Sequence, residues 1–135
     1  MSIKPELRRS DLIEPELSYK IVGAVYRAFN ELGPGLHERY YEKAVAIIFT
    51  EIDIPFKEQV PIPLNISGKT IGRYFADFII ENKIVVELKK GDRINRNHAT
   101  QLLAYLKATN LKLGILVYFG NGGVFFKRII NKQDS

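Results

Sequence analysis

At 135 residues, the chain is long enough for one domain with a substantial core and too short for two ordinary domains. Its 46% hydrophobic and 26% charged residues are typical of a globular protein, and the absence of cysteine excludes disulfide bonds and thiolate metal sites. The 20 Lys and Arg against 15 Asp and Glu give a net charge of +5, which favours a polyanionic partner without proving one.

The first 14 residues are polar, and we expect them to be loosely ordered ahead of a single domain over residues 15–135. The opening sequence MSIKPELRRSDLIEPEL has no apolar core of signal-peptide length. The longest apolar run, Ala44–Phe49, is far shorter than the roughly 20 residues that span a bilayer. We therefore expect a cytoplasmic protein that does not enter a membrane.

Three segments have the apolar spacing of amphipathic helices. The first covers residues 15–32 and is ended by Gly33-Pro34-Gly35. The second covers residues 37–52, and so tight a break predicts that the two helices pack as a pair. The third begins at Asn95 or Asn97, either of which is a suitable N-cap, and ends near residue 109.

Five segments are predicted as strands because they are rich in β-branched and aromatic residues or alternate in polarity. They cover residues 56–64, 69–80, 83–89, 113–119 and 124–130. Pro61 and Pro63 cannot donate hydrogen bonds to a neighbouring strand, so the first strand is expected at a sheet edge. The element order ααβββαββ predicts an α/β or α+β sandwich, in which helices flank a mixed central β-sheet.

The most informative stretch is YFADFIIENKIVVELKK, residues 74–90, where two apolar runs form a predicted hairpin that carries acidic residues. The length of its turn decides which side chains share a face. A three-residue turn places Asp77 directly opposite Glu87. Lys89 then shares their face, two residues further along. A two-residue turn would separate them.

Two facing carboxylates in an apolar hairpin repel each other and lose hydration, unless a proton or a cation lies between them. Mg²⁺, or Mn²⁺ in its place, suits Asp77 and Glu87, because Mg²⁺ binds oxygen ligands and commonly uses one or two carboxylates. Lys89 could hold the attacking water or neutralise charge on a phosphate. The alternatives are a structural ion cluster and a solvated strand face.

Three motifs resemble those of the PD-(D/E)xK nuclease superfamily. Asp77, Glu87 and Lys89 fit its D-x(n)-E-x-K core on consecutive strands. Gly35–Tyr41, GLHERYY, fits the G-x-x-E-x-x-Y signature of the GxxExxY family within that superfamily. Gln101–Tyr105, QLLAY, fits the Q-x-x-x-Y motif of RecB-like exonuclease domains. The resemblance covers nearly the whole chain and implies a restriction-endonuclease-like core.

Carried over residue by residue, the resemblance implies a metal bound by Asp77, Glu87 and the backbone carbonyl of Leu88. Lys89 would position or activate the attacking water. Ala76 departs from the pattern, since the superfamily is named for a proline at this position, where it supplies backbone geometry rather than a ligand.

The resemblance also implies roles for three helical residues. Glu38 would bring a carboxylate to the metal or its waters, and Gln101 and Tyr105 would contact substrate phosphate or orient Lys89. The only histidines, His37 and His98, have no second histidine at a ligand spacing, so no zinc site is expected.

Basic residues near the predicted site could track a phosphate backbone, although they could also form a solvated surface. They are Arg39, Lys90, Arg93, Arg96 and Lys107. Together with the resemblance they predict a metal-dependent nuclease that hydrolyses phosphodiester bonds in nucleic acid, with DNA favoured over RNA. The alternative is a nuclease-fold binding or regulatory module without turnover. The sheet edge or the first helix could supply a homodimer interface.

Overall fold

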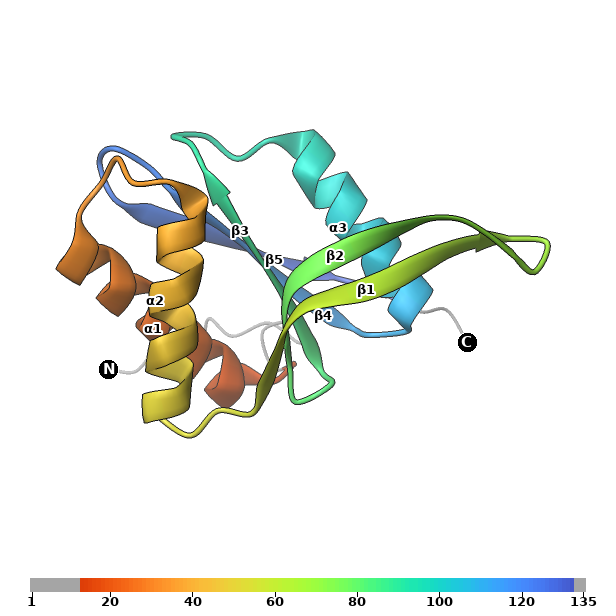
Figure 1. Cartoon of the computed structure of the whole chain (residues 1–135), viewed down its shortest axis with the longest axis horizontal. Helices are drawn as coiled ribbons and strands as arrows, with labels where there is room; N and C mark the ends of the chain where they lie inside the picture. The colour runs from red at the N-terminus through yellow and green to blue at the C-terminus, as the bar shows by residue number, and fades with distance from the viewer. Residues whose placement is uncertain (1–12, 133–135) are drawn as a thin grey trace, which may run out of the picture.

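The computed structural model describes residues 13–132 as a five-stranded sheet between two layers of helices (Figure 1). In chain order the elements are α1 (Pro15–Leu32), α2 (Glu38–Glu51), β1 (Phe56–Ile66), β2 (Lys69–Ile80), β3 (Ile84–Lys90), α3 (Arg96–Thr109), β4 (Leu113–Phe119) and β5 (Val124–Ile130). The predicted order ααβββαββ is therefore confirmed. The predicted loose segment lies outside the described residues as far as residue 12, and the single domain over residues 15–135 stays a prediction.

The strands lie in the order β1-β2-β3-β4-β5, so neighbours along the chain are also neighbours in the sheet. Among the described strands only β3 and β4 are parallel, and α3 makes the crossover between them. The other neighbours are antiparallel, which confirms the predicted mixed sheet. β1 lies at an edge, as Pro61 and Pro63 predict.

Side-chain caps determine where α2 and α3 begin. His37 Nδ1 accepts a hydrogen bond from the Arg39 N–H at 3.1 Å, and Asn95 Oδ1 accepts one from the Asn97 N–H at 2.8 Å. Asn95 is therefore the cap of α3. Within residues 13–132, no helix has both the length and the apolar character needed to cross a membrane.

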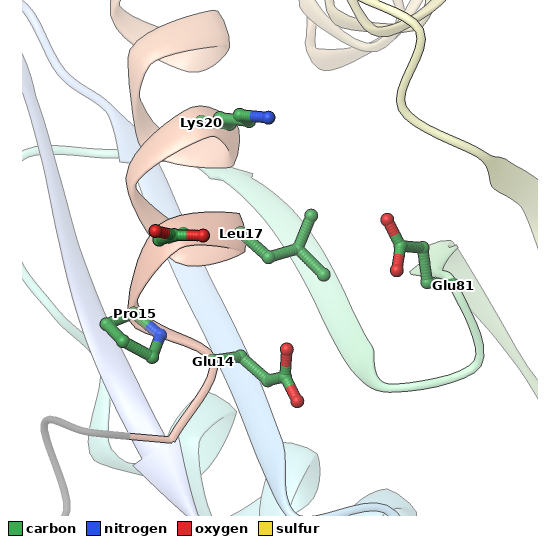
Figure 2. A pocket seen from close by; sticks show the side chains of 6 residues that line it. Glu14, Pro15, Leu17, Lys20 and Glu81 are labelled. Atoms are coloured by element: carbon green, nitrogen blue, oxygen red, sulfur yellow. The ribbon is translucent and has the colours of Figure 1, made fainter.

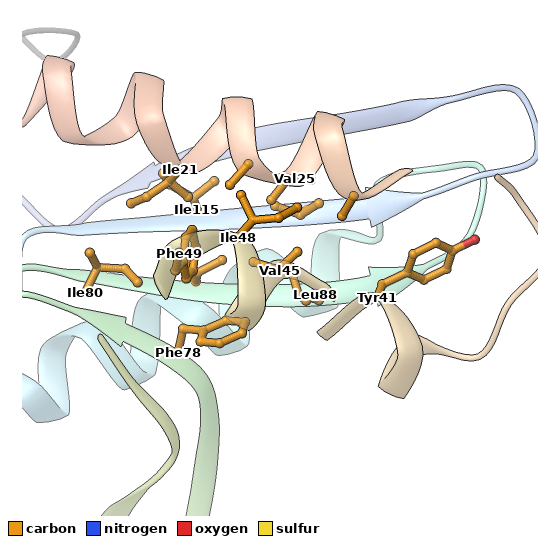
Figure 3. Close-up of a cluster of buried hydrophobic side chains, with 14 of the residues drawn as sticks. Ile21, Val25, Tyr41, Val45, Ile48, Phe49, Phe78, Ile80, Leu88 and Ile115 are labelled. Carbon is orange, nitrogen blue, oxygen red and sulfur yellow. The ribbon is translucent and has the colours of Figure 1, made fainter. Parts of the chain in front are cut away.

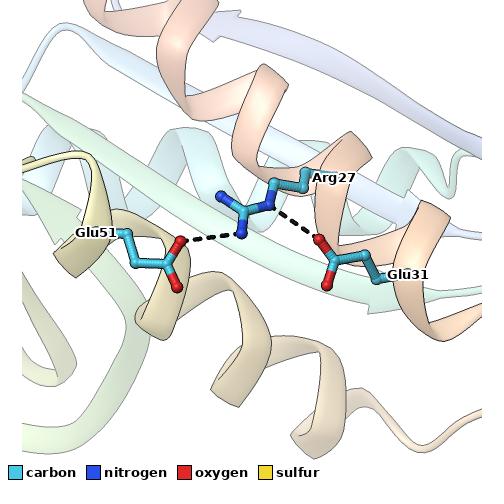
Figure 4. Close-up of polar contacts among 3 residues, drawn as sticks. All are labelled: Arg27, Glu31 and Glu51. Atoms are coloured by element: carbon cyan, nitrogen blue, oxygen red, sulfur yellow. Dashed lines mark hydrogen bonds and ion pairs between the residues drawn. The ribbon is translucent and has the colours of Figure 1, made fainter.

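The larger apolar core lies between the sheet and the pair α1 and α2 (Figure 3). Its buried side chains come from both helices and from the four strands β2, β3, β4 and β5, and they include Ile21, Val25, Tyr41, Phe49, Phe78, Leu88 and Ile115. Burying one large apolar side chain stabilises a fold by about 1.5–3 kcal/mol. Arg27 of α1 also pairs with Glu31 on its own helix and with Glu51 on α2 (Figure 4), but these ion pairs are exposed and contribute little.

Tyr41 anchors the loop that precedes α2. Its ring stacks on Phe119 with centroids 4.1 Å apart, and its hydroxyl donates to the Gly33 carbonyl at 2.6 Å. The same hydroxyl accepts from the Leu36 N–H at 3.3 Å. The tyrosine of the GLHERYY motif is thus a core residue that helps to place Glu38 at the start of α2.

The smaller apolar core lies between the sheet and α3. Here Gly114 of β4 lies directly beneath Leu102 of α3, because a Cβ atom at Gly114 would come within 2.9 Å of Leu102 Cδ2. Glycine at this position therefore lets the helix approach the sheet closely.

Replacing Gly114 with alanine is expected to lower the free energy of unfolding by about 1–3 kcal/mol, because the added methyl group overpacks against Leu102. Urea unfolding measures the loss. Gly72→Ala on β2 is the matched control, since a Cβ atom there meets no atom within 4 Å. Equal stability of the two variants would contradict the close approach.

Candidate active site

The pairing of β2 with β3 stops just before the two predicted metal ligands. Ile80 lies opposite Ile84, as a three-residue turn requires, and the last pair is Phe78 with Val86. The predicted three-residue turn is therefore confirmed. Beyond this pair come Asp77, which precedes Phe78 in β2, and Glu87, which follows Val86 in β3. From there β1 and β2 extend away from the rest of the sheet as a long hairpin (Figure 1). The carboxylates lie where the strands separate, not within a paired hairpin as expected from the sequence.

Asp77 and Glu87 bridge β2 and β3 at the point where these two strands separate. We call this point the fork. Glu87 Oε2 accepts a hydrogen bond from the backbone N–H of Asp77 at 3.0 Å. Asp77 Oδ2 accepts one from the backbone N–H of Leu88 at 2.8 Å. Each carboxylate thus takes the place of a ladder partner on the facing strand. This exchange holds the two carboxylates beside each other.

Burial and mutual repulsion perturb both carboxylates. Glu87 is only 4% exposed, and burial followed by the charge of Asp77 raises its pKa to about 8. Burial also raises the pKa of Asp77, although the Leu88 N–H opposes this rise. The positive charge of Lys89 lowers both pKa values. At neutral pH the pair therefore favours a bound proton or a cation in its place.

Two stacked tyrosines flank Glu87. The rings of Tyr74 on β2 and Tyr105 on α3 have centroids 3.4 Å apart and planes 13° apart. Burial and then the charge of Glu87 raise the pKa of both hydroxyls, which places both near that carboxylate. Gln101 is exposed, and within residues 13–132 no side-chain hydrogen bond joins it to Lys89 or to the fork.

Gln59 of β1 links the fork to the carboxylate of Glu42 on α2. Gln59 Nε2 donates to Glu42 Oε2 at 3.0 Å and to Asp77 Oδ1 at 3.2 Å. Burial raises the pKa of Glu42, and the nearby Glu58 and Glu38 add to the rise. The amide of Gln59 therefore separates two acidic groups that would otherwise repel each other.

Neither Glu42 nor Gln59 was among the residues predicted from the sequence. Glu42 lies four residues after Glu38, so helical periodicity could have placed both on one face of α2. Gln59 has no comparable signal. Its backbone has a left-handed φ of 48° within an edge strand, and only the folded chain brings it to Asp77.

Glu38 lies at the rim of the site. Its Oε2 accepts from the backbone N–H of Lys90 at 3.2 Å, and Lys90 Nζ donates to the Gly35 carbonyl at 3.5 Å. These contacts join the start of α2 to the end of β3. Across residues 13–132, no hydrogen bond links Glu38 to Asp77 or Glu87.

Four of the five predicted nucleic-acid contacts gather around the end of β3. Arg39 lies at the start of α2, Lys90 ends β3, and Arg93 and Arg96 lie in the following loop and at the first residue of α3. All four are exposed. Lys107 lies in the last turn of α3, at the opposite end of the helix from Arg96.

A surface hollow of about 380 Å³ lies at the start of α1 and at the turn between β2 and β3 (Figure 2). Its lining includes three carboxylates, those of Glu14, Glu16 and Glu81, but only one cation, Lys20. This balance repels a polyanion. The hollow is therefore no candidate for binding nucleic acid.

The side chains of the fork offer only carboxylate oxygens as metal ligands. Within residues 13–132, no group of three or more Asp, Glu and His side chains is placed to hold a metal ion. Two carboxylates still suit Mg²⁺ or Mn²⁺, because Mg²⁺ commonly uses one or two of them and keeps several waters. The Leu88 carbonyl stays a predicted further ligand.

The raised pKa of Glu87 predicts a pH-dependent stability of the metal-free protein. Native Glu87 keeps a proton that the unfolded chain loses near pH 4.5, so the free energy of unfolding should fall as pH rises from about 4.5 to about 8. The slope is at most about 1.4 kcal/mol per pH unit. Urea unfolding across this range should show a flatter profile for Glu87→Gln, and parallel profiles would contradict the shift.

Comparisons with known proteins agree with this architecture. Residues 15–129 match the profile of the PD-(D/E)XK nuclease superfamily. The chain is similar in fold to the crystal structure of SSO0001, with a TM-score of 0.56 and 24% sequence identity over 93% of this chain. It spans only 63% of the SSO0001 chain. No curated protein gives a significant match.

The family match covers all eight helices and strands but for the last residue of β5. The mixed sheet with flanking helices is consistent with the predicted restriction-endonuclease-like core. The narrower resemblance to the GxxExxY family stays a prediction. On the family match, the chain belongs to the PD-(D/E)XK nuclease superfamily.

Proposed function

We propose that the protein is a metal-dependent nuclease that hydrolyses phosphodiester bonds in nucleic acid, with DNA as its preferred substrate. The observation that carries this proposal is the meeting of Asp77 and Glu87 in the fork, where burial and repulsion raise the pKa of Glu87 to about 8. Membership of a nuclease superfamily supports it.

Asp77 and Glu87 would hold Mg²⁺ or Mn²⁺, with the Leu88 carbonyl as a further ligand. A bound divalent cation would supply a water of lowered pKa and would stabilise negative charge on the phosphate. A cation also removes the repulsion that the two buried carboxylates otherwise relieve by binding a proton.

The chain's own residues would orient the substrate. Lys89, whose charge acts on both carboxylates, would hold the attacking water or neutralise a phosphate oxygen. Tyr105 lies beside Glu87 and would contact substrate. The side chain of Gln101 is exposed, so it would have to move to contact the substrate together with Tyr105. Glu38 would act from the rim, as an acceptor for ordered waters.

The exposed cations around the end of β3 would bind the phosphate backbone without reading sequence. They are Arg39, Lys90, Arg93 and Arg96. Lys107 lies in the last turn of α3, 11 residues after Arg96 and thus about 17 Å further along the helix at 1.5 Å per residue. It would therefore contact only a substrate that runs along the helix.

A binding module without turnover is the second candidate. It is favoured by Gln59, whose amide donates to both Glu42 and Asp77 and so occupies space beside the fork that a cation would also use. The two candidates differ in whether the fork binds metal with nucleic acid present.

Cleavage assays test the nuclease directly. Wild-type protein should cut single-stranded, duplex or branched DNA faster than RNA, and only with Mg²⁺ or Mn²⁺ present. Asp77→Asn should abolish cleavage, and Lys89→Ala should lower its rate by about 10²-fold or more. Glu16→Gln, at the distant hollow, is the matched control. Equal residual cleavage by wild type and the Asp77 and Lys89 variants would point to a contaminant and reject the proposal.

Calorimetric titration with Mn²⁺ separates the two candidates. The nuclease should bind Mn²⁺ more tightly as pH rises toward 8, because the metal must displace the proton from Glu87. Glu87→Gln should lose most of this binding. If wild-type protein takes up no Mn²⁺ even with DNA present, the binding module is the better account.

A further inference from the structure

A buried tyrosine hydroxyl holds the imidazole of His98 near the end of β3. Tyr118, on β4, is 1% exposed. Its hydroxyl accepts a hydrogen bond from the backbone N–H of Asn95 at 2.9 Å and lies 2.6 Å from His98 Nδ1. The two rings also stack, with centroids 5.8 Å apart and planes 28° apart. His98 is therefore held both at one edge and across one face of its ring.

This arrangement selects one form of the imidazole. A backbone N–H can only donate, so the Tyr118 oxygen is the acceptor in its bond with Asn95. Within residues 13–132, His98 Nδ1 is the only partner of this buried hydroxyl that can accept its proton, so the arrangement that satisfies the hydroxyl has Tyr118 donating to Nδ1. A neutral imidazole that accepts at Nδ1 carries its own proton on Nε2. His98 thus presents an N–H from the edge that faces away from Tyr118.

His98 lies over the same part of the sheet as Lys89. Lys89 and Tyr118 are paired residues of β3 and β4, so their side chains share one face. Burial and then the charge of Lys89 lower the pKa of His98, whereas Glu38 raises it. The imidazole is therefore neutral at pH 7 and lies among the groups of the candidate active site.

We propose that His98 is a substrate-contacting residue, whose Nε2–H donates a hydrogen bond to a phosphate oxygen that Lys89 also binds. The proposal rests on the proposed nuclease function and adds a residue to it. Tyr118 and Asn95 are positioning residues, because they act only by holding His98 in this form.

The chemistry of a phosphodiester fits this pair of donors. Its non-bridging oxygens only accept hydrogen bonds, and they strengthen as acceptors when negative charge develops on them. Lys89 supplies a positive charge on a flexible stem, whereas His98 supplies a neutral donor whose direction is fixed. In a purely structural role, His98 would only accept the Tyr118 proton, and Nε2 would face water.

The two roles require different nitrogens, which matched substitutions separate. In His98→Asn the side-chain amide reaches the place of Nδ1 but not that of Nε2, whereas in His98→Gln it reaches the place of Nε2. We expect His98→Asn to lower kcat/KM for DNA cleavage by about 10²-fold, with His98→Gln recovering at least part of the loss. His37→Asn is the control, because asparagine also caps a helix.

Nuclear magnetic resonance of ¹⁵N-labelled histidine tests the proposal without turnover. In wild-type protein Nδ1 of His98 should be unprotonated and Nε2 protonated, and Tyr118→Phe should allow a mixture of the two forms. In the inactive Asp77→Asn variant, a short DNA oligonucleotide should shift the Nε2–H signal of His98 and leave that of His37 in place. Thermal unfolding of each variant separates lost contacts from lost folding.

The outcomes distinguish this proposal from the nuclease function itself. If the oligonucleotide leaves the Nε2–H signal of His98 unchanged, the proposal is overturned whether or not the protein cleaves DNA. If folded His98→Asn and His98→Gln both cleave like wild type, it is also overturned. If wild-type protein cleaves nothing, the nuclease function fails, and a shifted Nε2–H signal still supports phosphate contact by His98.

Discussion

The exchange of hydrogen bonds between Asp77, Glu87 and the facing backbone is the constraint on which the site depends. When β2 and β3 separate, their N–H groups lose ladder partners, and burial makes that loss unfavourable. The carboxylates replace those partners. The same bonds that close the fork also hold two buried carboxylates together, so the carboxylates repel each other. A bound proton relieves this repulsion, and a bound cation would also relieve it.

The layers on either side of the sheet supply the groups that surround this pair. α2 brings Glu42, which reaches Asp77 through Gln59, and α3 brings Tyr105, which stacks on Tyr74 beside Glu87. A β-strand places its side chains on both faces of the sheet, so helices from both layers can contact one pair of strands. Residues far apart in the chain therefore meet at the fork, where β1 is irregular because Gln59 has a left-handed φ of 48°.

Local patterns in the sequence predicted the fold well because each has a direct physical cause. The continuous apolar runs of β3 and β4 require burial on both faces, and the prolines of β1 require an edge. The sequence predicted the first and last residues of the helices less well than the helices themselves. The cap of α3 was open between Asn95 and Asn97, which both have the required side chain, and only the direction of the chain at that point selects Asn95.

The sequence by itself determined the element order and the turn between β2 and β3, which brings Asp77 and Glu87 to the same end of the two strands. Only the tertiary structure decided that the ladder ends before this pair, that Gln59 reaches Asp77, and that Tyr118 orients His98. These depend on where strands diverge and helices cross. Such geometry arises from packing of the whole chain, which no local pattern of residues encodes.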